Sequence, residues 1–329
     1  MEIFGNVVLL IISFVLLAKG ADFFVDGASG IATKLKIPQI IIGLTIVAMG
    51  TSAPEAAVSI SAAIEGNADI TIGNILGSNI LNILIILGIS SLISRLAVGK
   101  DTNFVDIPVM LGATALLFAL GWDGSIGLVD GIIFLIVFVL YLAYLFIVAR
   151  KRINKRELAE SVTQPLPDPA ADKPEEQAVK VRPLPIAIIL AVVGLAMVIL
   201  GSNFAVDSAT FLAKEMGVSD RFIGLTVVAL GTSLPELFTS VTAAIKKNAD
   251  IAVGNIVGSN IFNILFIVGL SSVIKPVPFV SSFLIDTAIA FAAGIILWVP
   301  CLVKKSIGRL TGIIMLLAYC GYFVYLVLI

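Results

Sequence analysis

The strongest constraint on the fold is a segment that occurs twice, with a constant offset of 181 residues. Residues 43–84 read GLTIVAMGTSAPEAAVSISAAIEGNADITIGNILGSNILNIL, and residues 224–265 read GLTVVALGTSLPELFTSVTAAIKKNADIAVGNIVGSNIFNIL. Of the 42 paired positions, 28 are identical. The matches include Thr, Ser, Pro, Glu, Asn and Asp, which are costly or unusual within a membrane. Lipid preference alone does not produce such matches, so the chain contains a duplication.

The composition indicates a membrane protein. Of the 329 residues, 59% are hydrophobic and 13% are charged, whereas soluble domains have roughly 45–50% apolar and about 25% charged residues. A spanning helix needs about 20 apolar residues, so the chain has room for about ten spans and almost no water-soluble domain. This composition excludes a soluble enzyme. The net charge of −1, without a basic surface, argues against nucleic acid as a partner.

Apolar runs between charges and turn residues predict ten helices in two sets of five. The first set covers residues 3–30, 40–65, 69–94, 104–121 and 127–149, and the second covers 185–212, 221–246, 250–274, 283–303 and 308–328. Each set has an odd number of spans, so the second copy enters the bilayer in the opposite orientation, as in secondary transporters. The predicted fold is an all-α polytopic membrane protein with ten transmembrane helices, arranged as two inverted five-helix repeats.

One long polar segment, residues 150–184, separates the first repeat (1–149) from the second (185–329). Its charges and prolines predict a partly disordered linker, with a short amphipathic helix on the membrane surface around 150–160 as the alternative. Seventeen Lys and Arg residues fall on the linker side of the bilayer and three on the other side. Because positive loops stay in the cytoplasm, we expect a cytoplasmic linker and two extracytoplasmic termini. The compact chain without a targeting segment indicates a prokaryotic plasma (inner) membrane.

Glu55 and Glu236 occupy equivalent positions about halfway along two predicted spans. An ionised carboxylate there is costly unless a partner compensates it. No basic residue lies in the middle of either span, so protons or bound cations must neutralise the pair. Pro54 and Pro235 cannot donate a hydrogen bond to the preceding turn, which leaves backbone oxygens available at membrane depth. Carboxylate and carbonyl oxygens are the ligands that Ca²⁺ and Na⁺ require.

Polar side chains at helical spacing extend this pattern in both repeats. They are Thr51, Glu55 and Ser59 with Thr232, Glu236 and Ser240, and, in the following spans, Asn74, Ser78 and Asn82 with Asn255, Ser259 and Asn263. Interhelical hydrogen bonding is the alternative for any single residue, but it explains two matched stripes beside two glutamates less well. A purely proton-conducting path would leave the stripes without a purpose. All-oxygen ligands without Cys or His argue against zinc, copper and iron, and no cofactor is expected.

Weaker matches extend the repeat toward the N-terminus. Asp26 corresponds to Asp207, and we interpret both as interhelical hydrogen-bonding residues rather than ion ligands. Asp22 corresponds to the uncharged Asn203 and lies three residues from Lys19, which predicts an i, i+3 ion pair.

At the repeated residues the sequence resembles the cation/calcium exchanger superfamily, particularly the sodium/calcium exchangers, whose two α-repeats carry GTSxPE and GNxxGSNxxN/D signatures. The four copies are GTSAPE at 50–55, GNILGSNILN at 73–82, GTSLPE at 231–236 and GNIVGSNIFN at 254–263. The resemblance covers the whole ten-span layout. It implies alternating access at a midplane site, with spans 1 and 6 sliding past a fixed core of spans 2, 3, 7 and 8.

The resemblance also implies roles for individual residues. Glu55 and Glu236 would bind Ca²⁺ together with backbone oxygens of Thr51 and Thr232, and Na⁺ would use the same glutamates. The implied sodium sites are Ala48, Thr51, Ser78 and Glu55, and their mates Ala229, Thr232, Ser259 and Glu236, with Asn82 and Asn263 flanking the centre. Many family members carry Asp at one flanking position, whereas this chain has Asn at both.

These residues predict an antiporter that exchanges Ca²⁺ for Na⁺. Two ionised glutamates balance one Ca²⁺ or two Na⁺, and three Na⁺ would leave one excess positive charge, so Ca²⁺/H⁺ antiport through the same glutamates is the nearest alternative. A cation channel is less favoured and would not depend on a counter-ion gradient. An intramembrane hydrolase lacks a base near Ser52 or Ser233, so the chain is not expected to be an enzyme. The expected partners are the ions and the lipid bilayer, with no obligatory protein partner.

Overall fold

The computed structural model describes residues 2–65, 69–162, 183–217 and 229–328, and within them the regular structure is helical apart from four two-residue strands. The first half contains α1 (Glu2–Lys34), α2 (Gln39–Ile42), η1 (Gly43–Val47), α3 (Ala48–Thr51), α4 (Ala53–Glu65), α5 (Asp69–Leu81), η2 (Asn82–Leu87), α6 (Gly88–Ile93), β1 (Leu96–Ala97), η3 (Thr102–Asp106), α7 (Ile107–Leu120), η4 (Gly121–Asp123), β2 (Ser125–Ile126) and α8 (Leu128–Val162). The second half contains α9 (Leu184–Glu215), α11 (Ala229–Thr232), α12 (Leu234–Ile245), α13 (Ala249–Phe262), η6 (Asn263–Val268), α14 (Gly269–Ile274), β3 (Val277–Pro278), α15 (Ser281–Lys304), β4 (Ser306–Ile307) and α16 (Arg309–Leu328). Elements η1, η2, η3 and η6 are π-helical turns, and η4 is a 3₁₀ turn.

Eight helices in the described part of the chain are long and apolar enough to cross a membrane. A ninth candidate is the pair Gln39–Thr51 and Ala53–Glu65, whose two pieces are bent by 50°. Helix α12 is apolar but shorter, and the first residues of the span predicted at 221–246 lie outside the described residues. The protein is therefore an all-helical membrane protein, with eight or nine candidate spans among the residues described.

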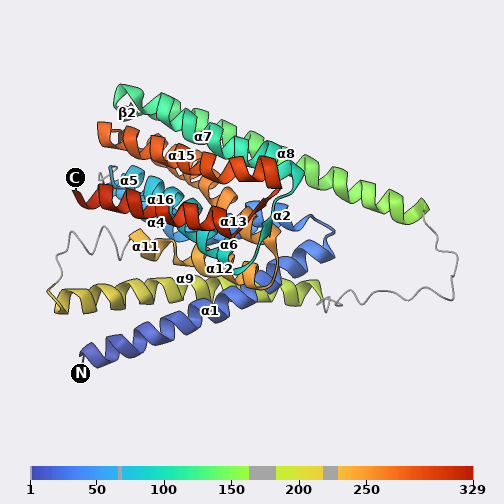
Figure 1. Cartoon of the computed structure of the whole chain (residues 1–329), viewed down its shortest axis with the longest axis horizontal. Helices are drawn as coiled ribbons and strands as arrows, with labels where there is room; N and C mark the ends of the chain where they lie inside the picture. The colour runs from blue at the N-terminus through green and yellow to red at the C-terminus, as the bar shows by residue number, and fades with distance from the viewer. Residues whose placement is uncertain (1, 66–68, 163–182, 218–228, 329) are drawn as a thin grey trace.

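Helix α8 is longer than its predicted span, 127–149. It continues to Val162 and so includes the first 13 residues of the segment predicted as a linker, 150–162. Arg, Lys, Glu, Leu and Ala dominate this stretch, and these are good helix formers, which explains the continuation. Figure 1 shows α8 extending beyond the rest of the bundle. The remainder of the predicted linker, 163–182, lies outside the described residues.

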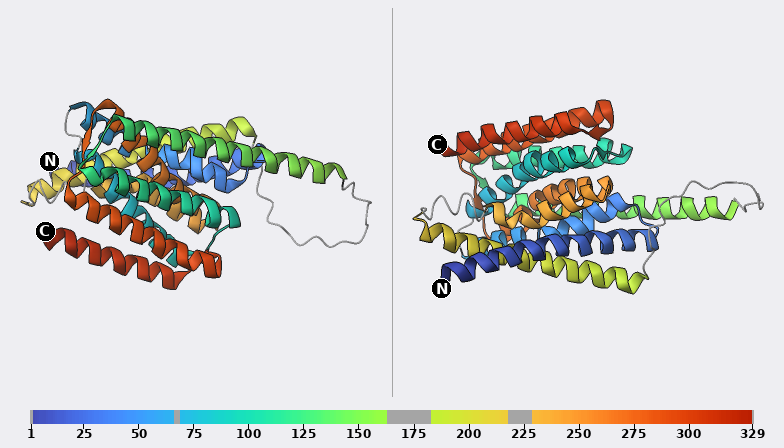
Figure 2. Two further views of the ribbon diagram at one scale, coloured as in Figure 1. Left: turned by 90° about the horizontal axis from the view of Figure 1, so that it is seen from above. Right: turned by 60° about the horizontal axis from the view of Figure 1, so that its bottom comes forward.

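Both chain ends lie at one end of the bundle, and the extension of α8 leaves from the opposite end (Figure 1). We refer to these as the terminal end and the linker end. Helices α1 and α9 lie side by side along one edge of the bundle, as Figures 1 and 2 show. A Cβ atom on Gly27 would be 2.3 Å from the backbone nitrogen of Ala191, and one on Gly194 would be 2.4 Å from that of Phe24. Only glycine permits these two backbones to approach so closely.

The two halves interlock most deeply through α5 and α13. In the most apolar stretch of Ala249–Ile274, 94% of residues are buried, and in that of Ile70–Ile93, 78% are buried. The corresponding value for α1 and for α9 is 28%. Helices α5 and α13 thus have protein on nearly all sides, whereas α1 and α9 present most of their surface to the outside of the bundle, where lipid would lie.

Two short strand pairs join the halves at opposite ends of the bundle. Strand β1 pairs antiparallel with β4, and β2 pairs antiparallel with β3. The offset of 181 residues relates β1 to β3 and β2 to β4, so the two pairings are the same contact made twice. The flanking backbone bonds repeat as well: Val98 donates to Lys305, and Phe279 donates to Gly124, both at 2.9 Å. The duplication therefore extends to contacts outside the segments with high sequence identity.

Candidate cation-binding site

Each of the two glutamates lies directly after a break in its helix. Helix α3 ends at Thr51 and α4 begins at Ala53, with Ser52 between them at φ −81° and ψ 9°. The second break is equivalent, with Ser233 at φ −91° and ψ 5° between α11 and α12. Each glutamate lies in the first turn of the helix after the break, where the helix dipole favours a carboxylate.

Proline is the local cause of both breaks, as the sequence predicted. Pro235 lies in the first turn of α12 and has no amide proton for the preceding turn. The carbonyl of Gly231 instead accepts a hydrogen bond from the Ser202 hydroxyl of α9, at 2.6 Å. A backbone oxygen released by proline is thus satisfied by a neighbouring helix.

Glu55 and Glu236 are both fully buried, and each accepts a hydrogen bond from the opposite half of the protein. Ser52 donates to Oε1 of Glu236 at 2.7 Å, and Ser233 donates to Oε1 of Glu55 at 3.1 Å. The hydroxyl of Ser78 lies 3.2 Å from that of Ser233. The two carboxylates therefore belong to a single site formed where the helix breaks of the two halves meet.

Four buried oxygens of this centre accept no hydrogen bond from any described residue. They are Glu55 Oε2, Glu236 Oε2, Asn82 Oδ1 and Asn263 Oδ1. All four are acceptors, and the repeat offset relates them in two pairs. A buried acceptor without a donor is costly, and a bound cation satisfies it. Within the described residues no group of three or more His, Cys, Asp or Glu side chains is placed to hold a metal ion, and the carboxylates of this centre are those of Glu55 and Glu236.

The amides of α5 and α13 form a cross-braced set. Asn79 and Asn260 each donate to the backbone oxygen of the other, at 3.2 and 3.1 Å. Asn82 donates to Oδ1 of Asn260, and Asn263 donates to Oδ1 of Asn79, both at 3.0 Å. With their nitrogens engaged in this way, Asn82 and Asn263 leave their oxygens as the free acceptors. Both begin π-helical turns, which are frequent at functional sites.

Several of the remaining predicted residues make contacts between the helices. Thr51 donates to Asn255 at 2.9 Å, and Asn255 in turn donates to Ser240 at 2.9 Å. Asn74 donates to Ser59 at 3.0 Å in the equivalent place. For these residues the predicted alternative, interhelical hydrogen bonding, is their observed contact.

The two serines that the resemblance assigns to sodium sites both make contacts across the halves. The resemblance grouped Ser78 with Ala48 and Ser259 with Ala229. In the structure, Ser259 donates to the backbone oxygen of Ala48 at 3.3 Å, whereas Ser78 lies beside Ser233 of the other half. The reason is geometric, because α13 packs against α3 of the first half and α5 packs against α11 of the second.

Sequence reasoning missed four polar residues of the centre as site residues: Ser52, Ser233, Asn79 and Asn260. Each lies inside a duplicated motif beside a predicted ligand. Their identity in the two copies was the available signal. Ser52 and Ser233 had been considered only as nucleophiles, a role that their hydrogen bonds to the glutamates do not require.

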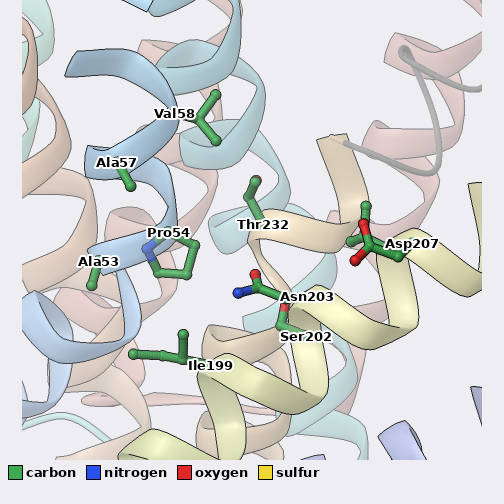
Figure 3. A pocket seen from close by; sticks show the side chains of 10 residues that line it. Ala53, Pro54, Ala57, Val58, Ile199, Ser202, Asn203, Asp207 and Thr232 are labelled. Carbon is green, nitrogen blue, oxygen red and sulfur yellow. The ribbon is translucent and has the colours of Figure 1, made fainter. Parts of the chain in front are cut away.

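A cavity of about 540 Å³ lies between α4 and α9 toward the terminal end. Figure 3 shows Pro54 and Ala57 on one wall, Asn203 and Asp207 on the other, and Thr232 between them. The cavity thus reaches residues adjoining the glutamates, which themselves stay fully buried. At the equivalent place on α12, Leu234 and Phe238 pack against the core that α1 and α9 share. The rings of Phe14 and Phe238 lie 6.1 Å apart there.

Comparison with known proteins identifies the family. The sequence model described as sodium/calcium exchanger protein matches residues 5–147 and 186–328, one match in each half. The chain belongs to this family. Its fold is that of the sodium-calcium exchanger NCX_Mj, whose structure after soaking with Na⁺ and Sr²⁺ has a TM-score of 0.82 and 30% sequence identity, over 98% of this chain and 99% of that one.

Two curated relatives are similar over most of their length. The putative antiporter CaxA of Alkalimonas amylolytica is 39% identical over 319 residues, which are 96% of each chain. The inner membrane protein YrbG of Escherichia coli (strain K12) is 38% identical over 268 residues, which are 82% of this chain and 79% of the relative. The predicted resemblance to cation/calcium exchangers is confirmed, and the family is one of membrane transporters that exchange cations, not of enzymes.

Proposed function

We propose that this exchanger family member transports Ca²⁺ in exchange for Na⁺, at the buried site between Glu55 and Glu236. The observation that carries the proposal is the set of four buried acceptor oxygens without donors at the point where the halves meet. Two ionised carboxylates match the charge of one Ca²⁺. Hard oxygen ligands and the absence of histidine from the sequence fit Ca²⁺ and Na⁺ better than transition metals.

The Ca²⁺ ligands are proposed to be the two glutamates with backbone oxygens of Thr51 and Thr232. The two proposed sodium subsites each draw on both halves. One contains Ala48, Thr51, Ser259 and Glu236, and the other contains Ala229, Thr232, Ser78 and Glu55. The hydrogen bonds of Ser259 to Ala48 and of Ser78 to Ser233 support this grouping. Asn82 and Asn263 flank the centre through their acceptor oxygens.

The proposed architecture has ten spans in two inverted repeats. The repeats are residues 1–149 and 185–329, and residues 150–184 form the linker. The reciprocal strand pairs and the reciprocal Asn79–Asn260 contacts support a two-fold relation between the halves. The proposed location is the plasma (inner) membrane, with the linker in the cytoplasm and both termini outside it. The charge distribution of the loops supports this orientation.

Alternating access is proposed to expose the site first to one side of the membrane and then to the other. The cavity beside Pro54 and Thr232 supports access from the terminal end. The packing of Leu234 and Phe238 against α1 and α9 supports closure toward the linker end. A movement of α1 and α9 relative to the core would exchange the two arrangements.

The test is uptake of Ca²⁺ into proteoliposomes under an imposed Na⁺ gradient, an imposed pH gradient, or neither. We expect uptake with the Na⁺ gradient alone. Uptake with the pH gradient alone would replace the proposal by Ca²⁺/H⁺ antiport. Equal uptake without any gradient would indicate a channel and overturn the proposal. The Glu55→Gln protein, reconstituted in parallel, controls for leakage.

Ca²⁺/H⁺ antiport is the second candidate because both flanking positions are asparagine. With Asn82 and Asn263 uncharged, the centre holds two carboxylates, and two protons leave it as neutral as one Ca²⁺ does. Exchange of one Ca²⁺ for two Na⁺ or two H⁺ moves no net charge across the membrane. Exchange of one Ca²⁺ for three Na⁺ moves one positive charge per cycle. The dependence of uptake on an imposed membrane potential therefore distinguishes the stoichiometries.

A further inference from the structure

The two copies of the repeat carry different charges at one pair of equivalent contacts. The offset of 181 residues relates Asp26 to Asp207, Asp22 to Asn203 and Lys246 to Glu65. The strand pairs, the Asn79–Asn260 contacts and the serine–glutamate contacts are all made twice, whereas this contact has a different charge balance at each end. The difference marks a place where the two ends of the molecule are not interchangeable.

At the linker end, Lys246 joins the end of α12 to α1. Its Nζ atom lies 2.6 Å from Oδ1 of Asp26 and 3.2 Å from Oδ1 of Asp22, and it donates to the backbone oxygen of Asp22 at 2.9 Å. Asp22 thus pairs with Lys246 of another helix, and the predicted pair with Lys19 of its own helix was wrong. Asp26 makes the interhelical contact that was predicted for it. The ammonium has three acceptors from α1, at the same end as the packing of Leu234 and Phe238 against α1 and α9.

At the terminal end, the equivalent residues face an open cavity. Asn203 and Asp207 line the cavity between α4 and α9, where Figure 3 labels both side chains. The residue equivalent to Lys246 is Glu65, which is exposed at the end of α4. Closing this end by the same contact would bring the Glu65 carboxylate toward Asp207, and like charges repel.

We propose that Lys246 is a positioning residue for the exchange reaction, which latches α12 to α1 and holds the linker end closed, while Glu65 disfavours the equivalent closure of the terminal end. The ion-free protein then rests with the terminal end open. The latch rests on the proposed function, because it needs a protein that opens alternately at two ends. The charge difference gives the two closed arrangements unequal free energies although their packing is repeated.

Accessibility of paired positions tests the latch. Val58, exposed at the terminal-end cavity, corresponds by the offset to Thr239, which is fully buried on α12. Val58→Cys and Thr239→Cys are made separately in a background carrying Cys301→Ala and Cys320→Ala. The rate of reaction with a hydrophilic maleimide is measured on the purified full-length protein without Na⁺ or Ca²⁺. We expect rapid reaction at position 58 and slow reaction at position 239.

Lys246→Glu should then raise the rate at position 239 and lower it at position 58. Partly exposed ion pairs contribute up to about 1 kcal/mol, so the change should be on the order of two- to fivefold. Lys247→Glu is the matched control, since it makes the same charge change at the same helix end. Unchanged rates in Lys246→Glu, or an equal change in Lys247→Glu, would overturn the latch. Lys246→Arg should restore the wild-type rates.

Glu65→Lys is an independent test at an exposed position, so it does not depend on whether Lys246→Glu folds. It places an ammonium opposite Asp207 and should lower the rate at position 58 while raising it at position 239. Unchanged labelling rates at positions 58 and 239 in Glu65→Lys would refute the role of Glu65. Labelling rates do not depend on which ions are exchanged. Ca²⁺ uptake that ignores the Na⁺ gradient would therefore reject the proposed function without rejecting the latch, and Na⁺-driven uptake with unaltered labelling would do the reverse.

Discussion

The interlocked core of the two halves and the α1–α9 pair are both contacts between repeat-related helices, but they are built in different ways. In the core, α4 to α6 and α12 to α14 meet through hydroxyls, amides and carboxylates, with serines and asparagines donating across the interface. Between α1 and α9, glycines such as Gly27 and Gly194 bring the backbones into direct contact. We call the core contact the directional interface, because hydrogen bonds fix its geometry. We call the α1–α9 contact the smooth interface, because close packing of the two backbones forms it.

This difference assigns different mechanical properties to the two regions. Sliding the core helices past each other would break buried hydrogen bonds, each of which leaves an unsatisfied group that costs about 1–3 kcal/mol. The α1–α9 pair contacts the core through the buried hydrogen bond from Ser202 to Gly231 and through more exposed contacts, such as that of Lys246 with Asp26. The comparison therefore favours a fixed core that holds the ions and a mobile α1–α9 pair that opens and closes the path.

The largest effect on the core is expected from Glu55→Gln and Glu236→Gln. Each removes one of two carboxylates that compensate the cation in a buried site, which costs about 3–5 kcal/mol, or roughly a hundred- to several-thousandfold in Ca²⁺ transport. The shape of the side chain is kept, so the thermal denaturation midpoint should not fall. Asp123→Asn, at an exposed turn, is the matched control and should transport normally. Wild-type Ca²⁺ uptake by either glutamine variant would remove that glutamate from the site.

The smooth interface should be broken by Gly27→Ala. The new Cβ would lie 2.3 Å from a backbone nitrogen and 2.7 Å from a backbone oxygen of α9, and backbone atoms cannot turn aside as a side chain can. Overpacking of this kind costs about 1–3 kcal/mol, and we expect a lower denaturation midpoint together with slower transport. Gly5→Ala meets no atom within 4 Å and serves as the control. Equal stability of the two variants would show that α1 and α9 do not pack this closely.

The directional interface is tested by Asn79→Ala and Asn260→Ala. Each removes one amide of the reciprocal pair and leaves buried partners unsatisfied, which costs about 1–3 kcal/mol of unfolding free energy. Because the contacts are reciprocal, the two losses should be equal and the double variant should lose less than their sum. Unequal or strictly additive losses, measured by chemical denaturation in detergent, would contradict a shared contact.

The smallest effect is expected from adding charge to the core with Asn263→Asp. A third carboxylate attracts the coupling ion with at least about 1 kcal/mol, so the Na⁺ concentration for half-maximal exchange should shift by about fivefold or more. Asn82→Asp is the matched variant and should shift it similarly, since the two oxygens are equivalent. An unaltered Na⁺ dependence in both would place these positions outside the coupling path.

Much of the helix pattern followed from local properties. Apolar runs predicted α1, α7, α9, α15 and α16 to within a few residues, because a helix in lipid must satisfy its backbone internally and its length follows from the membrane. The end of α8 did not follow in the same way. Its charged stretch is compatible with both a linker and a helix, and the structure continues it as a helix to Val162.

The burial of the site residues was also predictable, since duplicated polar residues in apolar spans require a shared polar environment. Their partners were not. Ser52 bonds to Glu236, 184 positions away, and Lys246 rather than Lys19 pairs with Asp22. Spacing along one helix predicts only neighbours on that helix. Contacts between distant segments depend on how the helices cross.

The sequence by itself determined the duplication, the membrane-spanning helical class and the identity of the two buried glutamates, because each of these follows from residue type and periodicity. Only the tertiary structure decided that the serines and asparagines bond across the halves, that Ser259 contacts Ala48 of the other repeat, and that Lys246 pairs with Asp22 and Asp26 at one end while a cavity lies toward the other. Two copies of a sequence carry the same local preferences, and it is their packing against each other that makes their environments differ.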